Sequence, residues 1–254
     1  NFQAMKFKAL SFIILVAGLS FFSSCDGDSE NPLEQQQSNP VPQPGDADGV
    51  MAAIKAKSNT PSGTPSVPGM PDILLDVASA NFYSTSGGSS LVNVGEVMLN
   101  DFKLQNISGN TYINNFTDIT LGINSGQANG WKVAGANGFD GFTHTTAKVM
   151  PGVVKFASNQ SETISISSSV TLSIQSVPSG VDNILWVISD GSKVVTKESR
   201  ATSITFSTSE LSGMKTTGQG IIQVAAYNSE SRTIGGKKIY FINETVDSKF
   251  VTLN

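Results

Sequence analysis

From residue 72 onward, apolar residues come in short runs separated by Gly, Asn and Ser. No segment keeps apolar residues at helical spacing over three turns, so a helix formed here would have no continuous apolar face to bury. In Thr163–Ile166 and Val170–Ile174, apolar and polar residues alternate instead, as in a strand with one buried and one solvated face. The sequence therefore predicts an all-β fold built from antiparallel β-sandwich layers.

The expected strands form two series along the chain. The first series is Ile73–Val77, Leu91–Leu104 with a break near Asn100–Asp101, Thr111–Phe116, Asp118–Ile123 and Gly130–Val133. The second series is Val153–Phe156, Thr163–Ser167, Val170–Gln175, Asn183–Ser189, Lys193–Lys197, Ser203–Phe206, Gly220–Ala226, Lys237–Ile242 and Lys249–Leu253. Two series predict tandem sandwich domains, residues 72–157 and 158–254; a single larger sandwich with shared sheets is the alternative.

The second series has a recognisable order. Asn183–Ser189 carries Trp186, Asp190–Gly191 is a strong hairpin turn, and a polar turn through Ser209–Leu211 precedes the next long strand. This order, with a Trp on a central strand, resembles immunoglobulin-like and PKD-like domains, although the paired cysteines of antibody domains are absent. The resemblance covers residues 158–254 and implies a β-sandwich there.

The charge balance excludes one class of partner. Charged residues make up 14% of the chain, and the formal net charge is −4. Removal of Lys6 and Lys8 with the N-terminal segment leaves 14 basic against 20 acidic residues, a net charge of −6. An acidic surface repels phosphates, so we expect no nucleic-acid partner.

The N-terminal residues read as a secretory signal. Lys6 and Lys8 follow Met5, and Ala9–Phe22 is an uncharged apolar run. The run is shorter than the ~20 residues of a transmembrane helix but suits a signal peptide, which we place at residues 5–24. Small residues then precede Cys25, the only cysteine of the chain.

The segment Phe22-Ser23-Ser24-Cys25 resembles the bacterial lipobox, although that motif prefers Leu where Phe22 stands. The resemblance implies lipidation of Cys25 and a membrane anchor; an ordinary secretory signal that leaves a free thiol is the alternative. Asp26, Asp28 and Glu30 resemble the surface-export signal of Bacteroidota lipoproteins. That implies a cell-surface protein of the outer membrane, with a periplasm-facing lipoprotein as the alternative.

Residues 25–71 have the composition of a spacer. Eight of the ten prolines lie between Pro32 and Pro71, together with a glutamine run and a Ser/Thr/Pro/Gly tract at Ser58–Gly69. Such a segment lacks backbone donors and buries too little apolar area to offset the entropy lost on ordering. We expect a disordered linker that allows at most a transient helical turn at Met51–Lys57.

Familiar catalytic and metal centres are not expected. With one cysteine and one histidine, the chain has no intramolecular disulfide and no multi-thiolate zinc site. His144 lacks a Gly-x-Ser-x-Gly nucleophile motif and is expected in a surface loop. Carboxylates that a glycosidase pair would need are instead expected at turns: Glu96, Asp101, Asp118 and Asp140. We therefore predict no enzyme, no cofactor and no metal.

One stretch could bind a ligand. Trp131, Phe139 and Phe142 lie among Gly and Asn residues that include Asn137. Exposed rings beside amides suit sugar binding, because a ring covers the C–H face of a sugar and amides bond its hydroxyls. The competing interpretation places the rings in the core of a small domain.

The sequence thus favours a non-catalytic surface lipoprotein that binds a polysaccharide or a partner protein. A structural accessory subunit or adhesin of an outer-membrane complex is the alternative, and a secreted glycoside hydrolase is a third. An exposed aromatic row would favour polysaccharide binding, and a broad apolar patch would favour a protein complex.

Overall fold

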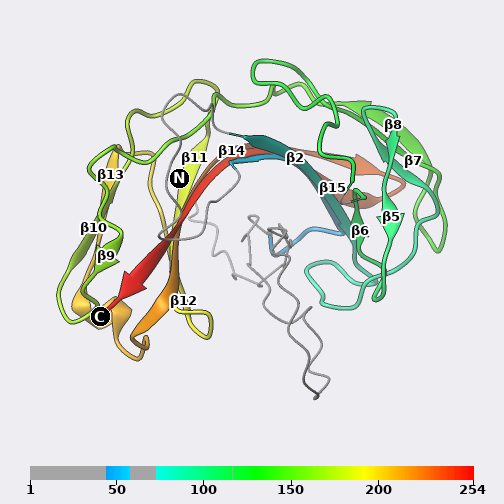
Figure 1. Ribbon diagram of the computed structural model, residues 1–254. Helices are drawn as coiled ribbons and strands as arrows, with labels where there is room; N and C mark the ends of the chain where they lie inside the picture. Colours follow the sequence, from blue (N-terminus) through cyan, green and yellow to red (C-terminus); the bar gives the residue numbers. More distant parts are fainter. Residues whose placement is uncertain (1–43, 58–72, 116) are drawn as a thin grey trace, which may run out of the picture.

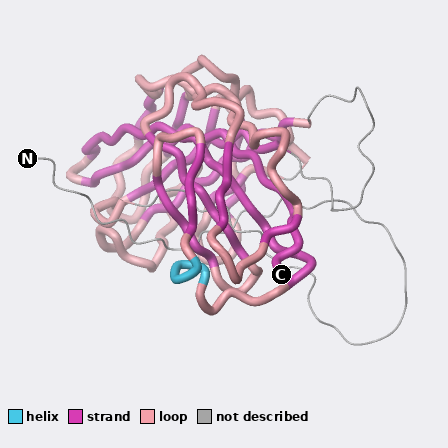
Figure 2. Tube along the Cα trace, turned by 90° about the vertical axis from the view of Figure 1, so that its left-hand side faces the viewer, coloured by secondary structure: helices cyan, strands magenta, loops and turns pink. Residues whose placement is uncertain are grey.

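The computed structural model describes residues 44–57, 73–115 and 117–254, and these residues are almost entirely β-structure. Their strands form sheets of nine, four and two strands. Figure 1 shows the main sheet as an arch with a lobe at each end, and Figure 2 shows the same strands from the side with one short helix at the margin. The predicted all-β sandwich class is confirmed.

Two long strands run the length of the arch. β14 (Thr217–Ile234) and β15 (Lys237–Leu253) form an antiparallel hairpin, seen in orange and red in Figure 1. Gly235 and Gly236 make its two-residue turn with φ of 57° and 78°, a conformation that glycine adopts without steric cost. The strands expected at Lys237–Ile242 and Lys249–Leu253 are therefore two parts of one strand.

The other strands of the main sheet extend from both sides of this hairpin. On one side β14 pairs with β11 (Asn183–Ser189), which pairs with the edge strand β12 (Val194–Glu198). On the other side β15 is followed in order by β1 (Gly49–Lys57), β2 (Leu74–Phe82), β6 (Tyr112–Ile113) and the edge strand β5 (Gln105–Asn106). β9 (Thr163–Ile164) pairs with the end of β15.

The prediction of a spacer over residues 25–71 is wrong for Gly49–Lys57. These residues are β1, which pairs in parallel with β15 and antiparallel with β2. Val50, Ala52 and Ile54 join one apolar cluster, while Met51 and Ala53 join another on the opposite face of the sheet. Because both faces are buried, the strand shows no alternation of polar and apolar residues. The rest of the predicted linker, the signal peptide, Cys25 and the acidic residues after it lie outside the described residues.

Small sheets cover each end of the arch. The four-stranded sheet has the order β4 (Phe102–Lys103), β3 (Val97–Leu99), β7 (Gly130–Val133), β8 (Phe142–Thr145). At the other end β10 (Val170–Ser173) pairs with β13 (Ser203–Phe206). The helix α1 (Thr208–Leu211) stands where a polar turn was expected, and a capping box between Ser207 and Glu210 begins it.

The two lobes have separate cores on one face of one sheet. Ile239 and Phe241 of β15 belong to the core under the four-stranded sheet, and Val251 and Leu253 belong to the core under β10 and β13. All four positions are odd-numbered, so their side chains leave the strand on the same side. A third apolar cluster, from even positions of β1 and β15, lies on the opposite face.

A row of polar side chains separates the two cores. On the same face of β15, Asn243, Thr245 and Asp247 are buried. They bind the chain that connects the lobes: Asn243 Nδ2 donates to Lys148 O (2.9 Å), Thr245 Oγ1 to Gly152 O (2.9 Å), and Phe156 N to Asp247 Oδ2 (2.8 Å). The tandem arrangement with a join near residue 157 is therefore not confirmed, because β14 and β15 pass through both lobes without interruption.

The predicted hairpin turn after β11 is confirmed, and Asp190 holds it. This carboxylate accepts hydrogen bonds from Lys193 N (2.6 Å) and Ser192 N (2.8 Å) within the turn and from Lys215 N (2.6 Å) of the segment before β14. Burial opposes ionisation of Asp190, but the hydrogen bonds outweigh it and lower its pKa from 3.8 to about 2.

We expect Asp190→Asn to lower the free energy of unfolding at pH 7 by about 2 kcal/mol. A carboxyl whose folded pKa is depressed contributes stability above its unfolded pKa and loses it as pH falls through the folded value. The difference between wild type and variant should therefore shrink between pH 4 and about pH 2, as measured by urea unfolding. The control is Glu162→Gln, at an exposed residue. An equal difference at both pH values would contradict this account.

Candidate functional site

One open groove of about 570 Å³ lies at one end of the arch. It lies beside β4 and β5, which are edge strands of different sheets separated in sequence by Leu104 alone. Leu104 is buried, and its N–H donates to Val97 O (2.9 Å). The chain therefore passes from the four-stranded sheet to the main sheet at the groove.

Side-chain amides are the most frequent polar groups of the lining. The polar residues around the groove are Asn93, Glu96, Lys103, Gln105, Asn106, Asn115 and Asp118. Gln105 and Asn106 are exposed, and within the described part of the chain their side-chain amides make no hydrogen bond. Free amides both donate and accept hydrogen bonds, so they match peptide groups and sugar hydroxyls alike.

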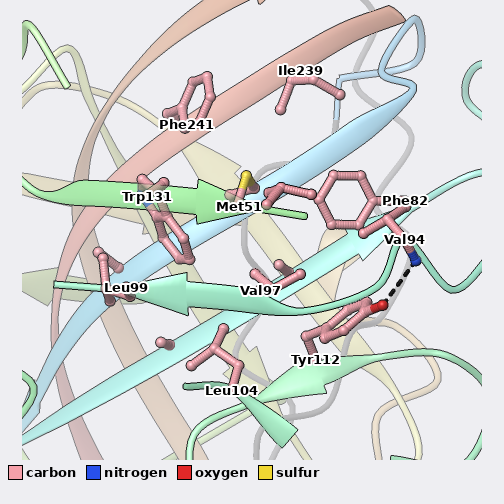
Figure 3. Close-up of a cluster of buried hydrophobic side chains, with 14 of the residues drawn as sticks. Met51, Phe82, Val94, Val97, Leu99, Leu104, Tyr112, Trp131, Ile239 and Phe241 are labelled. Carbon is pink, nitrogen blue, oxygen red and sulfur yellow. Dashed lines mark hydrogen bonds between the residues drawn. The ribbon is translucent and has the colours of Figure 1, made fainter. Parts of the chain in front are cut away.

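Tyr112 supports the groove from below. Its ring is buried in the core, where Figure 3 shows it between Leu104 and Val94. The Tyr112 hydroxyl accepts a hydrogen bond from Val94 N (2.8 Å) and donates to Asn93 Oδ1 (2.9 Å). Asn137 Nδ2 donates to the Asn93 carbonyl oxygen (2.7 Å). These contacts hold Asn93 in place at the rim.

The charges at the groove are predominantly acidic. Glu96 Oε2 lies 2.9 Å from Lys103 Nζ. The hydrogen bond and charge of Lys103, together with the charge of Lys132, hold the pKa of Glu96 below its ordinary value, so Glu96 is ionised at neutral pH. Asp118 adds a second carboxylate that Lys103 does not pair with.

The predicted aromatic ligand site does not exist as an exposed surface. Trp131 is 1% exposed and Phe139 is 7% exposed, and both belong to the core shown in part in Figure 3. Phe142 is partly buried against the same core and contacts Phe241 edge-on. The competing interpretation as core is confirmed for these rings. Asn137 is exposed, and its link to the candidate site is the hydrogen bond to Asn93.

The expectation that His144 lies in a surface loop is wrong. It lies on β8, buried, with its ring 4.2 Å from that of Phe241. Nδ1 is 3.0 Å from Arg232 Nη1, and Nε2 is 2.6 Å from Glu230 Oε1. A guanidinium only donates, so Nδ1 accepts and Nε2–H donates to Glu230. His144 thus ties β8 to β14, and both its nitrogens are engaged.

Glu230 completes this contact. Burial raises the pKa of Glu230. Hydrogen bonds from Lys148 N (2.9 Å), His144 and Ala147 N (2.8 Å) lower it by more, so the pKa lies below its ordinary value. No hydroxyl or thiol of a described residue bonds the imidazole. The arrangement is that of a structural ion cluster and lacks the nucleophile of a catalytic triad.

Residues 44–57, 73–115 and 117–254 contain neither a metal centre nor a membrane-spanning helix. No group of three or more His, Cys, Asp or Glu residues could hold a metal ion there. No helix in these ranges is long and apolar enough to cross a membrane. No protein-family model and no curated protein sequence matches the chain.

The groove was not predicted from the sequence, although one local pattern indicates the change of sheets beside it. Leu91–Leu104 was predicted as a strand with a break near Asn100–Asp101, and the structure places a turn there with φ of 47° and 67°. After that turn, polar and apolar residues do not alternate regularly, and Leu104 is the one apolar residue between Lys103 and Asn106. Such a pattern fits a chain that changes sheets at its one buried residue.

We expect Trp131→Ala to lower the free energy of unfolding by about 3–5 kcal/mol, because it removes a fully buried ring and leaves a cavity. Urea unfolding followed by circular dichroism measures this. Phe102→Ala, at an aromatic side chain that is 40% exposed, is the matched control and should cost much less. An unchanged free energy of unfolding in the Trp131 variant would contradict the burial of this ring in the core.

Proposed function

We propose that this protein is a non-catalytic cell-surface lipoprotein that binds a partner protein through the groove beside β4 and β5. The observation that carries the proposal is the meeting of two sheet edges at a groove lined by free amides. Edge strands present backbone groups without a sheet partner, and proteins commonly use them to bind another chain.

The residues that line the groove offer no exposed aromatic ring on which a sugar could stack, and this favours a protein over a polysaccharide. The aromatic residue of the groove lining, Tyr112, is buried and bonded through its hydroxyl. Phe102 (40% exposed), Ile107 (40%) and Ile119 (51%) adjoin groove residues in sequence and supply apolar surface. An apolar margin beside polar groups is common in protein interfaces. The amide lining keeps polysaccharide binding as the second candidate.

Catalysis is not part of the proposal. Glycosidases need one carboxyl whose pKa is raised so that it can donate a proton. Lys103 lowers the pKa of Glu96 instead, which disfavours it as a general acid. His144 is already bonded on both sides. These features support a role in binding, in agreement with the lack of a nucleophile motif in the sequence.

The proposed cellular location of the protein rests on its N-terminal sequence. The apolar run, Cys25 and the acidic residues that follow support export, lipidation and display on the outer membrane. Acyl chains on the new N-terminus anchor the protein stably, because each buried CH₂ contributes ~0.8 kcal/mol. A lipid-anchored binding protein serves equally as an accessory subunit of an outer-membrane complex.

We expect Cys25→Ala to move the chain from the membrane fraction to the soluble fraction, because the acyl chains have no other attachment site. Fractionation of cells, together with labelling by a palmitate analogue, measures this. Protease treatment of intact cells should degrade the wild-type protein. A variant that stays in the membrane and keeps its label would refute lipidation at Cys25, and protection from protease would refute surface display.

Reversal of the groove charges tests the binding role. We expect Glu96→Lys combined with Asp118→Lys to weaken the binding of a basic peptide at least about tenfold at low salt, because attraction becomes repulsion. The probes are a phage-displayed library of random peptides, the neutral polysaccharide laminarin and the acidic polysaccharide alginate. Glu162→Lys, an exposed reversal outside the groove lining, is the control. Failure of all probes to bind in a groove-dependent way would refute the proposed function.

A further inference from the structure

The register of β5 shows which of its backbone groups face the groove side. Ile107 N donates to Thr111 O (2.9 Å), so these residues form a hydrogen-bonded pair. Pairs alternate in an antiparallel ladder, which makes Asn106 and Tyr112 a non-bonded pair. The N–H and C=O of Asn106 therefore point away from β6, toward the open edge of the main sheet.

The other neighbour of β6 agrees with this assignment. Asn114 N donates to Ala78 O (3.2 Å), and Tyr112 pairs with Ala80 two residues along. Bonded pairs recur every second residue, so the backbone groups of Tyr112 point to β2. They cannot also point to Asn106, and the edge at Asn106 is open.

β4 directs its free backbone groups to the other side of the chain. Leu104 N donates to Val97 O (2.9 Å), which makes these residues a bonded pair and Lys103–Met98 a non-bonded one. Ala134 N donates to Glu96 O (2.8 Å), so the groups of Met98 point to β7. The N–H and C=O of Lys103 therefore point away from β3, whereas those of Asn106, three residues on, point to the opposite side of the extended chain.

We propose that the groove binds an extended, basic segment of the partner by main-chain hydrogen bonding to Asn106. The inference rests on the proposed function and specifies its ligand. Strand addition to a sheet edge supplies affinity through the backbone, and side chains beside the edge supply specificity. Gln105 and Asn106 add free amides that bond further peptide groups.

Charge complementarity selects the side chains of this segment. Glu96 and Asp118 face the groove, and Lys103 is paired with Glu96. A Lys or Arg of the bound segment gains attraction from Asp118, which forms no ion pair with another described residue, whereas an acidic segment is repelled. A neutral polysaccharide carries no charge and would gain no binding energy from these carboxylates.

Two variants at one position test the pairing. Asn106→Pro removes the outward N–H without breaking the ladder to β6, and proline is tolerated on edge strands in this orientation. Asn106→Ala keeps the N–H and removes only the side-chain amide. Circular dichroism and thermal unfolding check that both variants fold. The ligand is a synthetic copy of a peptide selected from the phage library, titrated against the full lipidated chain in detergent micelles.

We expect the selected peptides to be basic and extended. Asn106→Pro should weaken binding at least about tenfold, and Asn106→Ala should change it by less than about threefold. Binding should also fall as salt rises, because Glu96 is exposed and Asp118 is only half-buried, so that salt screens both carboxylates.

Other outcomes separate this inference from the proposed function. Peptide binding that depends on Glu96 and Asp118 but tolerates Asn106→Pro would overturn strand pairing and leave the binding role standing. Binding of laminarin that is lost equally in Asn106→Ala and Asn106→Pro would overturn the peptide ligand, because both variants lack the side-chain amide. No groove-dependent binding of any probe would overturn both.

Discussion

The structure depends on one strand, β15, whose successive side chains on one face belong to two different cores and to the polar row between them. Along a single face of β15, apolar residues serve one core, Asn243, Thr245 and Asp247 hold the connecting chain, and apolar residues then serve a second core. Because buried polar groups need hydrogen-bond partners, this row stabilises only one path for residues 148–156. Asn243 is central, since its side chain also bonds Asn129 (2.8 Å) and Asn228 (3.2 Å). The lobes are therefore joined through a shared sheet and an ordered polar seam.

That arrangement determines where the molecule is open. The main sheet ends at β5 and the four-stranded sheet ends at β4, and the chain crosses between them at Leu104. Burial of Leu104 and Tyr112 fixes the crossing, and the ladder alternation then turns the backbone of Asn106 outward. The same contacts that close the core thus leave an edge exposed. A rigid edge of this kind suits recognition, because little order must be gained on binding.

How much of this was predictable varies with the range of the interactions. The turn at Asp190 and the strand Asn183–Ser189 follow from adjacent residues, and both were found. β1 was missed because its proline-rich flanks and its two buried faces hide the period of a strand. The sequence allowed Trp131 to be a core residue or a ligand-binding residue, because an aromatic residue among Gly and Asn has the same local pattern in both cases. The groove was missed because its residues come from separate strands and loops.

The sequence by itself determined the all-β class, the hairpin turn at Asp190–Gly191 and the expectation of an exported, lipidated chain, because each rests on patterns within a few residues. Only the tertiary structure decided that β1 completes the main sheet, that both lobes share β14 and β15, and that His144 is enclosed by Glu230 and Arg232. These outcomes depend on contacts between residues far apart in the chain. Burial and strand register arise from such contacts, and local composition does not encode them uniquely.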